Sequence, residues 1–240
     1  MTDYFEVHAR DSAARRGELR LAESVPTPAL VGDVLEDAGS RWHEDREVPE
    51  GDEAALTVLP HRALPRGTEP PVAEAFAPES PDIEFPSAAV VSPATAADHG
   101  ADAYLLSGAP GYAGDAEAFV DAVLEVRGSI PDDTALGLSG VATPANAATL
   151  VYAGVDLLDE KRARARGLEG FYLATDGEAF LEDLDELPCA CSACRTPVAA
   201  FSRADCADHD ANAATGPWQA EQAHGSSSRS SRNASPSVER

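Results

Sequence analysis

The residues best suited to chemistry are three cysteines that lie within one short segment, Cys189, Cys191 and Cys194. Thiolates are preferred ligands of zinc, and such tight spacing lets one loop supply several corners of the tetrahedron that zinc favours. In a reducing compartment, cysteines this close together indicate a metal rather than disulfides. The spacing therefore predicts bound Zn²⁺. The competing interpretation is a cluster of buried thiols without a metal.

A fourth ligand has to come from elsewhere in the chain. His209 lies 15 residues beyond Cys194 (209 − 194 = 15), within reach of a loop or short helix that folds back, and Cys206 is the competing candidate. Four protein ligands leave no open position for water, so the predicted zinc site is structural rather than catalytic.

The segments before the cysteines alternate between apolar strands and amphipathic helices. Strands are expected at residues 88–91, 103–106, 135–138 and 155–158, and helices at 116–126 and 144–153. Strand and helix alternation implies parallel strands with right-handed crossovers, so the pattern predicts an α/β barrel or an open doubly wound sheet.

The two ends of this region have patterns of their own. We expect an opening hairpin from residues 4–9 and 17–21, a short strand at 56–60 and a proline-rich loop at 65–86. A further strand at 171–174 and a helix at 177–187 are expected to lead into the cysteines.

The charge balance indicates adaptation to salt. The net charge is −24, and all but one of the 18 basic residues are arginine, Lys161 being the single lysine. A dense carboxylate surface maintains solubility where salt screens self-repulsion, although a generic acidic protein would also carry a negative net charge.

Acidity normally argues against nucleic acid, but a salt-adapted protein can recognise RNA by shape, stacking and a local basic patch. The candidate patch is Lys161, Arg162, Arg164 and Arg166; a solvated charged loop or helix end is the favoured interpretation of this run.

Targeting signals are not recognisable in the sequence. No apolar run approaches the roughly 18 residues of a membrane span, and residues 1–6 lack the basic and apolar regions of a signal peptide. We therefore expect a cytoplasmic protein without a membrane partner.

The composition changes after about residue 212. Residues 213–240 contain no Asp, Ile, Leu or Phe and are rich in serine. Such a segment buries too little apolar area to offset its ordering entropy, so we expect a disordered tail. The abrupt loss of acidic bias also suggests a frameshifted or truncated end.

Several segments, taken together and in order, resemble the tRNA-guanine transglycosylase superfamily. The zinc spacing, the run from Gly154 to Asp159, the run from Glu169 to Gly177 and the turn from Gly140 to Pro144 are similar to family motifs. The segments Phe5 to Asp11 and Thr27 to Leu30 resemble the opening of the family fold. The resemblance covers residues 4–31 and 135–212 well and the middle poorly.

The resemblance implies an α/β fold of the (β/α)8 TIM-barrel type, present here as a portion of a barrel, with a cysteine-rich zinc-binding subdomain, acting on tRNA. It implies three regions: a barrel portion at 1–187, a zinc-binding motif at 188–212 with ligands Cys189, Cys191, Cys194 and His209, and the tail at 213–240. In the family, the second aspartate of the run from Gly154 is the nucleophile that attacks C1′ of the ribose, which here corresponds to Asp159. Taken without the family, Asp159 is better interpreted as a strand-end residue that caps a turn. Asp156 is expected to be structural.

Two departures narrow the implied activity. The Asp-Ser-Gly motif with which transglycosylases bind the incoming base occurs nowhere in the sequence. This favours the archaeosine synthase branch, which modifies 7-cyano-7-deazaguanine already in tRNA at position 15. That branch also carries a Pro-Cys…Lys-Pro-Tyr motif and a C-terminal RNA-binding domain, neither of which occurs here, so an N-terminal portion is expected.

The alternatives to an archaeosine synthase function are a non-catalytic tRNA-binding scaffold and an active transglycosylase with a diverged base site. Further expected partners are a second copy of the chain or another enzyme of the archaeosine pathway.

Overall fold

A computed structural model describes residues 4–35, 55–61, 64, 67–75, 83–112, 114–187, 189, 191, 193–195, 202–210 and 213. No helix among these residues has the length and apolar character needed to cross a membrane. The tail predicted at 213–240 lies outside them, apart from residue 213.

The chain opens with a small antiparallel sheet, as its alternating pattern predicts. Its strands are β1 (Phe5–Asp11), β2 (Ala14–Arg20) and β3 (Ser24–Thr27), in that order. A bulge between Val7 and Ala9 interrupts the pairing of β1 with β2, opposite Gly17. A Cβ at Gly17 would lie less than 3.0 Å from the carbonyl oxygen of Glu6, so only glycine fits this crossing.

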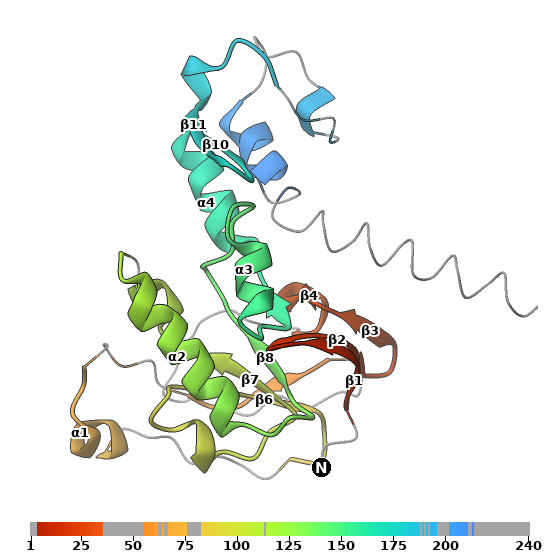
Figure 1. Ribbon diagram of the computed structural model, residues 1–240, viewed down its shortest axis with the longest axis vertical. Coiled ribbons are helices and arrows are strands. Elements are labelled where there is room, and N and C mark those ends of the chain that lie inside the picture. The colour runs from red at the N-terminus through yellow and green to blue at the C-terminus, as the bar shows by residue number, and fades with distance from the viewer. Residues whose placement is uncertain are drawn as a thin grey trace, which may run out of the picture.

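A parallel sheet forms the centre of the molecule (Figure 1). Its order is β4-β9-β8-β7-β6-β5, with every neighbouring pair parallel. The strands are β4 (Ala29–Leu30), β5 (Thr57–Val58), β6 (Ser87–Val91), β7 (Ala103–Leu106), β8 (Ala135–Gly137) and β9 (Leu157–Leu158). The expected strands are therefore confirmed in position, and their parallel pairing confirms an α/β fold with crossover connections.

Alternate residues of the central strands enter two different apolar layers. Tyr104, Leu136 and Leu158 belong to the layer that includes α2 (Ala116–Ser129) and α3 (Ala147–Tyr152). Ala103, Ala135 and Leu157 belong to the other layer, which includes Phe5 and Leu19 of the hairpin. The period of two thus places helices on one face of the sheet and the hairpin on the other.

Both helices between the central strands begin close to where the sequence predicts them. The Asp115 carboxylate accepts a hydrogen bond from the backbone N–H of Ala118 at 3.1 Å and so caps the start of α2. Residues 65–86, expected to be loop, contain a short helix α1 (Pro70–Ala75). Short 3₁₀ turns lie at Val31–Asp33, Ala96–Asp98, Ala109–Tyr112, Leu181–Asp183 and Ala193–Arg195.

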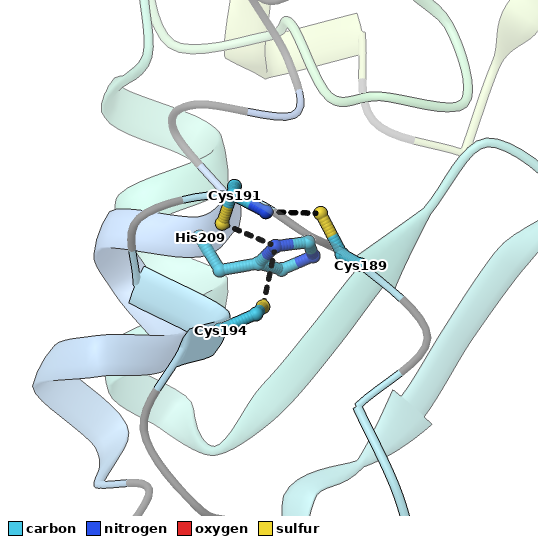
Figure 2. Close-up of side chains that lie close together, drawn as sticks. All are labelled: Cys189, Cys191, Cys194 and His209. Carbon is cyan, nitrogen blue, oxygen red and sulfur yellow. Dashed lines mark hydrogen bonds between the residues drawn. The ribbon is translucent and has the colours of Figure 1, made fainter.

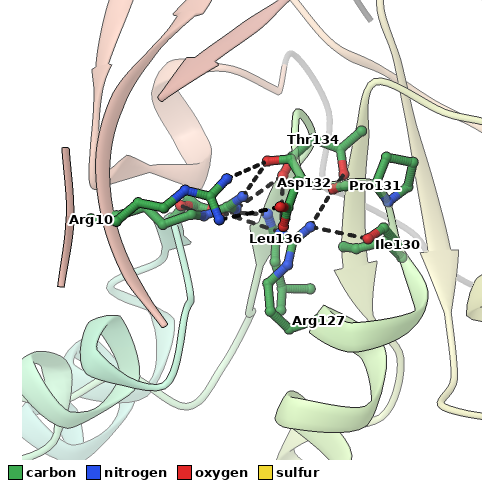
Figure 3. A network of polar contacts seen from close by, with 9 residues as sticks. Arg10, Arg127, Ile130, Pro131, Asp132, Thr134 and Leu136 are labelled. Atoms are coloured by element: carbon green, nitrogen blue, oxygen red, sulfur yellow. Dashed lines mark hydrogen bonds and ion pairs between the residues drawn. The ribbon is translucent and has the colours of Figure 1, made fainter. Parts of the chain in front are cut away.

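A buried polar network fastens the opening hairpin to the sheet (Figure 3). The Arg15 guanidinium is ion-paired with the Asp156 carboxylate and also donates to the carbonyl oxygens of Asp132, at 2.8 Å, and Thr134, at 2.9 Å. The backbone N–H of Leu136 donates to Asp156 at 2.8 Å. Asp156 is fully buried, so its charge depends on these partners. This is the structural role expected of Asp156.

The chain beyond β9 leaves the central sheet. Helix α4 (Lys161–Glu169) ends at Gly170, whose φ of 93° is left-handed, and leads into an antiparallel hairpin of β10 (Phe171–Ala174) and β11 (Gly177–Phe180). Figure 1 shows this hairpin at the far end of α4 from the sheet, beside a further helix at residues 203–210. The strand expected at 171–174 is confirmed, but it pairs with β11 rather than with the parallel sheet.

The helix expected at 177–187 is wrong. Residues 177–180 form β11, and Leu181–Asp183 form a 3₁₀ turn. The preceding pair Thr175 and Asp176 forms a two-residue turn, and Ala174 then pairs with Gly177. A tight turn after an established strand favours hairpin pairing over the helical propensity of the acidic residues that follow.

Candidate metal centre

The three clustered cysteines and His209 come together in the structure. Their ligand atoms, the Sγ atoms of Cys189, Cys191 and Cys194 and a ring nitrogen of His209, all lie within 4.8 Å of one another. The cysteines follow β11 on a single segment, whereas His209 projects from the helix at 203–210 (Figure 2). Ligands bound tetrahedrally at about 2.3 Å lie about 3.8 Å apart, so metal binding requires movements of only about 1 Å.

The His209 ring is oriented by its second nitrogen. Nε2 lies 3.0 Å from the carbonyl oxygen of Leu173, which can only accept a hydrogen bond, so the proton belongs on Nε2. Nδ1 is then left with its lone pair toward the sulfurs, at 3.3 Å from Cys194 Sγ and 3.5 Å from Cys191 Sγ. A backbone carbonyl that fixes the tautomer in this way is a common outer-shell partner of a metal-ligating histidine.

The surroundings of the four side chains also suit a metal. Burial lowers the pKa of His209, which favours the neutral imidazole that binds metal ions. Burial and neighbouring thiols raise the pKa of Cys194 to about 12. A bound divalent cation would lower the pKa of this thiol, because its positive charge stabilises neighbouring thiolates that otherwise repel one another.

The side chains of Tyr172 and Cys206 pack against the cysteine segment. The Tyr172 ring stacks on the His209 ring with centroids 4.0 Å apart and planes 9° apart, and its hydroxyl lies 3.6 Å from Cys194 Sγ. The Cys206 thiol donates to the carbonyl oxygen of Phe171 at 2.8 Å, and burial raises its pKa to about 12. Cys206 thus lies beside the group of four rather than in it, and the residue brought to the three cysteines is His209.

A glycine lets the His209 helix approach α4. A Cβ at Gly167 would lie less than 3.0 Å from backbone atoms of Cys206 and Ala207. Arg164 supports the same contact through an ion pair with Asp208 at 2.8 Å. The roles of Gly167 and Tyr172 were not predicted from the sequence. The available signal, a glycine within a highly charged helix, can be interpreted only when the partner helix is known.

The predicted basic run lies on α4 and is largely engaged within the chain. Arg164 also pairs with Glu160, and Arg166 pairs with Glu169 and Glu178 and lies over the Phe171 ring, 3.4 Å from its centroid. For Arg164 and Arg166 these contacts agree with the favoured interpretation of the run as part of a charged helix rather than an RNA contact.

Asp159 lies where the central sheet ends, one residue after β9. Its carboxylate accepts hydrogen bonds from the Ser139 hydroxyl at 2.5 Å and the backbone N–H groups of Gly140 at 2.7 Å and Lys161 at 3.3 Å. The Lys161 ammonium lies 3.7 Å from Oδ2 of the same carboxylate. We call these four residues the strand-end site. Asp159 is buried and fixed, which suits either a positioned carboxylate or a tie between two loops.

The fold and the metal centre thus define an α/β domain with a parallel sheet and an appended Cys3His group. Comparison with known proteins assigns this class more closely. The family model for queuine tRNA-ribosyltransferase matches residues 87–215, which is more than half of the chain. The chain therefore belongs to this family.

Three curated relatives are similar to the chain. An archaeosine synthase of Haloferax volcanii is 67% identical over 89% of this chain, and an archaeosine synthase subunit alpha of Methanosarcina acetivorans is 32% identical over 85% of it. A tRNA-guanine(15) transglycosylase of H. volcanii is 37% identical over 31% of it. The chain spans only 36% of the length of each of the first two relatives.

Proposed function

We propose that this chain serves in tRNA modification, in the formation of archaeosine at position 15. The observation that carries the proposal is the 67% identity to an archaeosine synthase along 89% of the chain. The proposal includes a barrel of the (β/α)8 type, of which six parallel strands are present among the described residues. It retains the division into a barrel portion at 1–187, a metal-binding motif at 188–212 and a tail, and a cytoplasmic location, where tRNA is modified.

We further propose that the metal is a structural Zn²⁺ held by Cys189, Cys191, Cys194 and His209. Three sulfurs and one nitrogen are a ligand set that zinc favours, and four protein ligands leave no position for a reacting water. When bound, the ion would cross-link the cysteine segment to the helix at 203–210. The chain's own contribution is to orient His209 through Leu173 and Tyr172.

Asp159 is proposed as the residue that faces C1′ of the modified nucleotide. Its support is its place at the carboxyl end of a parallel strand, where barrel enzymes place the groups that act on substrate. The Ser139 hydroxyl and the Gly140 N–H hold the carboxylate in one orientation. Because the sequence contains no Asp-Ser-Gly triplet, we do not extend the proposal to exchange of a free base.

The metal is tested by its content in purified protein. Wild type is expected to carry one zinc per chain, and Cys191→Ser to lose it. Cys206→Ser is the matched control, since its side chain lies in the same apolar cluster but donates to a carbonyl. Loss of zinc from Cys206→Ser with retention in Cys191→Ser would overturn the ligand set.

The tRNA function is tested by binding and by base exchange. We expect the full chain to bind a tRNA that carries 7-cyano-7-deazaguanine at position 15 in concentrated KCl, and to incorporate no radiolabelled guanine. Absence of binding across the salt range would refute the tRNA function. Incorporation of guanine would instead identify an active transglycosylase.

A further inference from the structure

The lysine content of the chain singles out one position. Of 18 basic residues only Lys161 is a lysine. Lysine and arginine differ in chemistry, because an ammonium is a compact point charge and a guanidinium is a planar fork. All remaining basic residues of the chain are arginine. The single lysine thus places its compact ammonium group beside Asp159.

The Lys161 side chain forms the exposed part of an otherwise buried group. Its Nζ atom lies 3.5 Å from the Ser139 hydroxyl and 3.7 Å from Asp159 Oδ2. Both distances exceed those of strong charge-assisted hydrogen bonds, about 2.7–2.9 Å. The side chain of Lys161 is 52% exposed and that of Asp159 only 6%. The ammonium therefore covers the buried carboxylate on the solvent side and keeps donor capacity for another acceptor.

Two of the three arginines on the same helix form ion pairs within the chain. Arg164 is paired with Glu160 and Asp208, and Arg166 with Glu169 and Glu178. Their guanidinium groups are therefore engaged by carboxylates of α4 and its N-terminal flank, of the β10/β11 hairpin and of the 203–210 helix. Among these three cations, Lys161 is the one whose charged group lies beside Asp159 and Ser139.

We propose that Lys161 contacts the substrate, with its ammonium ion beside the ribose and phosphodiester of the nucleotide over Asp159. This inference rests on the proposed tRNA function and adds a residue to it. Nζ lies within 4 Å of the carboxylate proposed to face C1′. It therefore stands within reach of the same ribose and supplies positive charge for the adjacent phosphate in a chain of net charge −24.

The single lysine makes a direct test possible. A tRNA with a chemically synthesised abasic ribonucleotide at position 15 presents an aldehyde at C1′. An amine within reach adds to this carbon with loss of water, and borohydride transfers hydride to the resulting imine to give a stable secondary amine. The expected result is one protein–RNA adduct in the full wild-type chain, mapped by peptide mass spectrometry to Lys161.

Two variants separate proximity from charge. Lys161→Arg keeps the positive charge but removes the primary amine, so the amount of adduct per bound tRNA should fall at least tenfold. The double variant Lys161→Arg, Arg162→Lys moves the amine by one residue on α4 and should not restore trapping. Lys161→Met should bind tRNA with a slope of log affinity against log salt that is smaller by about one, because one phosphate contact is lost.

The outcomes distinguish this inference from the function on which it rests. Binding of the abasic tRNA without an adduct, or with an adduct only at the terminal amine, would overturn the role of Lys161 and leave the tRNA function standing. Adducts that survive in Lys161→Arg would do the same. No binding by wild type would refute the tRNA function and the Lys161 contact together.

Discussion

Replacing Gly167 by alanine tests whether the metal centre depends on its contact with α4. The added Cβ would lie less than 3.0 Å from backbone atoms of Cys206 and Ala207. Backbone atoms cannot rotate away as a side chain does, so the helix at 203–210 has to move outward. His209 is on that helix, and its ring is held between the Leu173 carbonyl, at 3.0 Å, and Cys194 Sγ, at 3.3 Å.

The size of the effect follows from the cost of overpacking. Inserting one methyl group into a tightly packed contact costs about 1–3 kcal/mol. If the strain exists only while the helix is docked and the metal is bound, the same energy appears in the metal affinity. At about 1.4 kcal/mol per tenfold change, we expect binding weakened by roughly 5- to 150-fold.

The assay is competition for Zn²⁺ against a chromophoric chelator, with the fraction of metal retained as the readout. Gly128→Ala is the matched control, because Gly128 also lies inside a helix but a Cβ there would meet nothing within 4 Å. This control should leave metal affinity unchanged and increase stability slightly, since alanine favours helix. Equal affinities of Gly167→Ala and Gly128→Ala would refute the coupling of α4 to the metal centre.

Three further changes test the rest of the fold. Gly17→Ala should disrupt the opening hairpin and lower the midpoint of thermal unfolding by several degrees, whereas Gly32→Ala, with no neighbour within 4 Å, should not. Arg15→Met should reduce the free energy of unfolding by about 3–5 kcal/mol in denaturant titrations, because it removes the nearer charged partner of the buried Asp156 carboxylate and leaves Arg127 at 4.0 Å. Arg10→Met removes an exposed ion pair and should cost less than about 1 kcal/mol; a loss equal to that of Arg15→Met would contradict this account. Chelation of the metal should increase amide exchange around the 203–210 helix and not in the central strands, and uniform exchange would show that the centre supports the whole fold.

The central strands could be predicted because their signal is local. Residues 103–106 form a short apolar run, and in the structure alternate members face the helix layer and the hairpin layer. The cysteine group could be predicted for the same reason, since three of its members are within six residues of one another. Sequence spacing alone does not separate His209 from Cys206 as the fourth member of this group.

What could not be predicted depends on which segments pair or dock with one another. The acidic residues within 177–187 suit a helix, yet pairing with β10 across a two-residue turn makes residues 177–180 a strand. The hydrogen bond from the Cys206 thiol to the Phe171 carbonyl joins residues 35 apart in sequence, and the docking of two helices sets it. The role of Gly167 arises from the same docking, and no property of its immediate neighbours indicates it.

One helix connects the two sites. α4 begins at Lys161, two residues after Asp159, and Gly167 near its other end touches the helix that carries His209. The helix has 9 residues, and at a rise of about 1.5 Å per residue it spans roughly 13 Å. A metal bound at the proposed centre would hold the 203–210 helix in place and would thereby also fix the far end of the helix from which Lys161 reaches Asp159. On the proposed function, a structural ion would contribute to substrate contact without touching the substrate, by limiting the orientations that α4 can adopt.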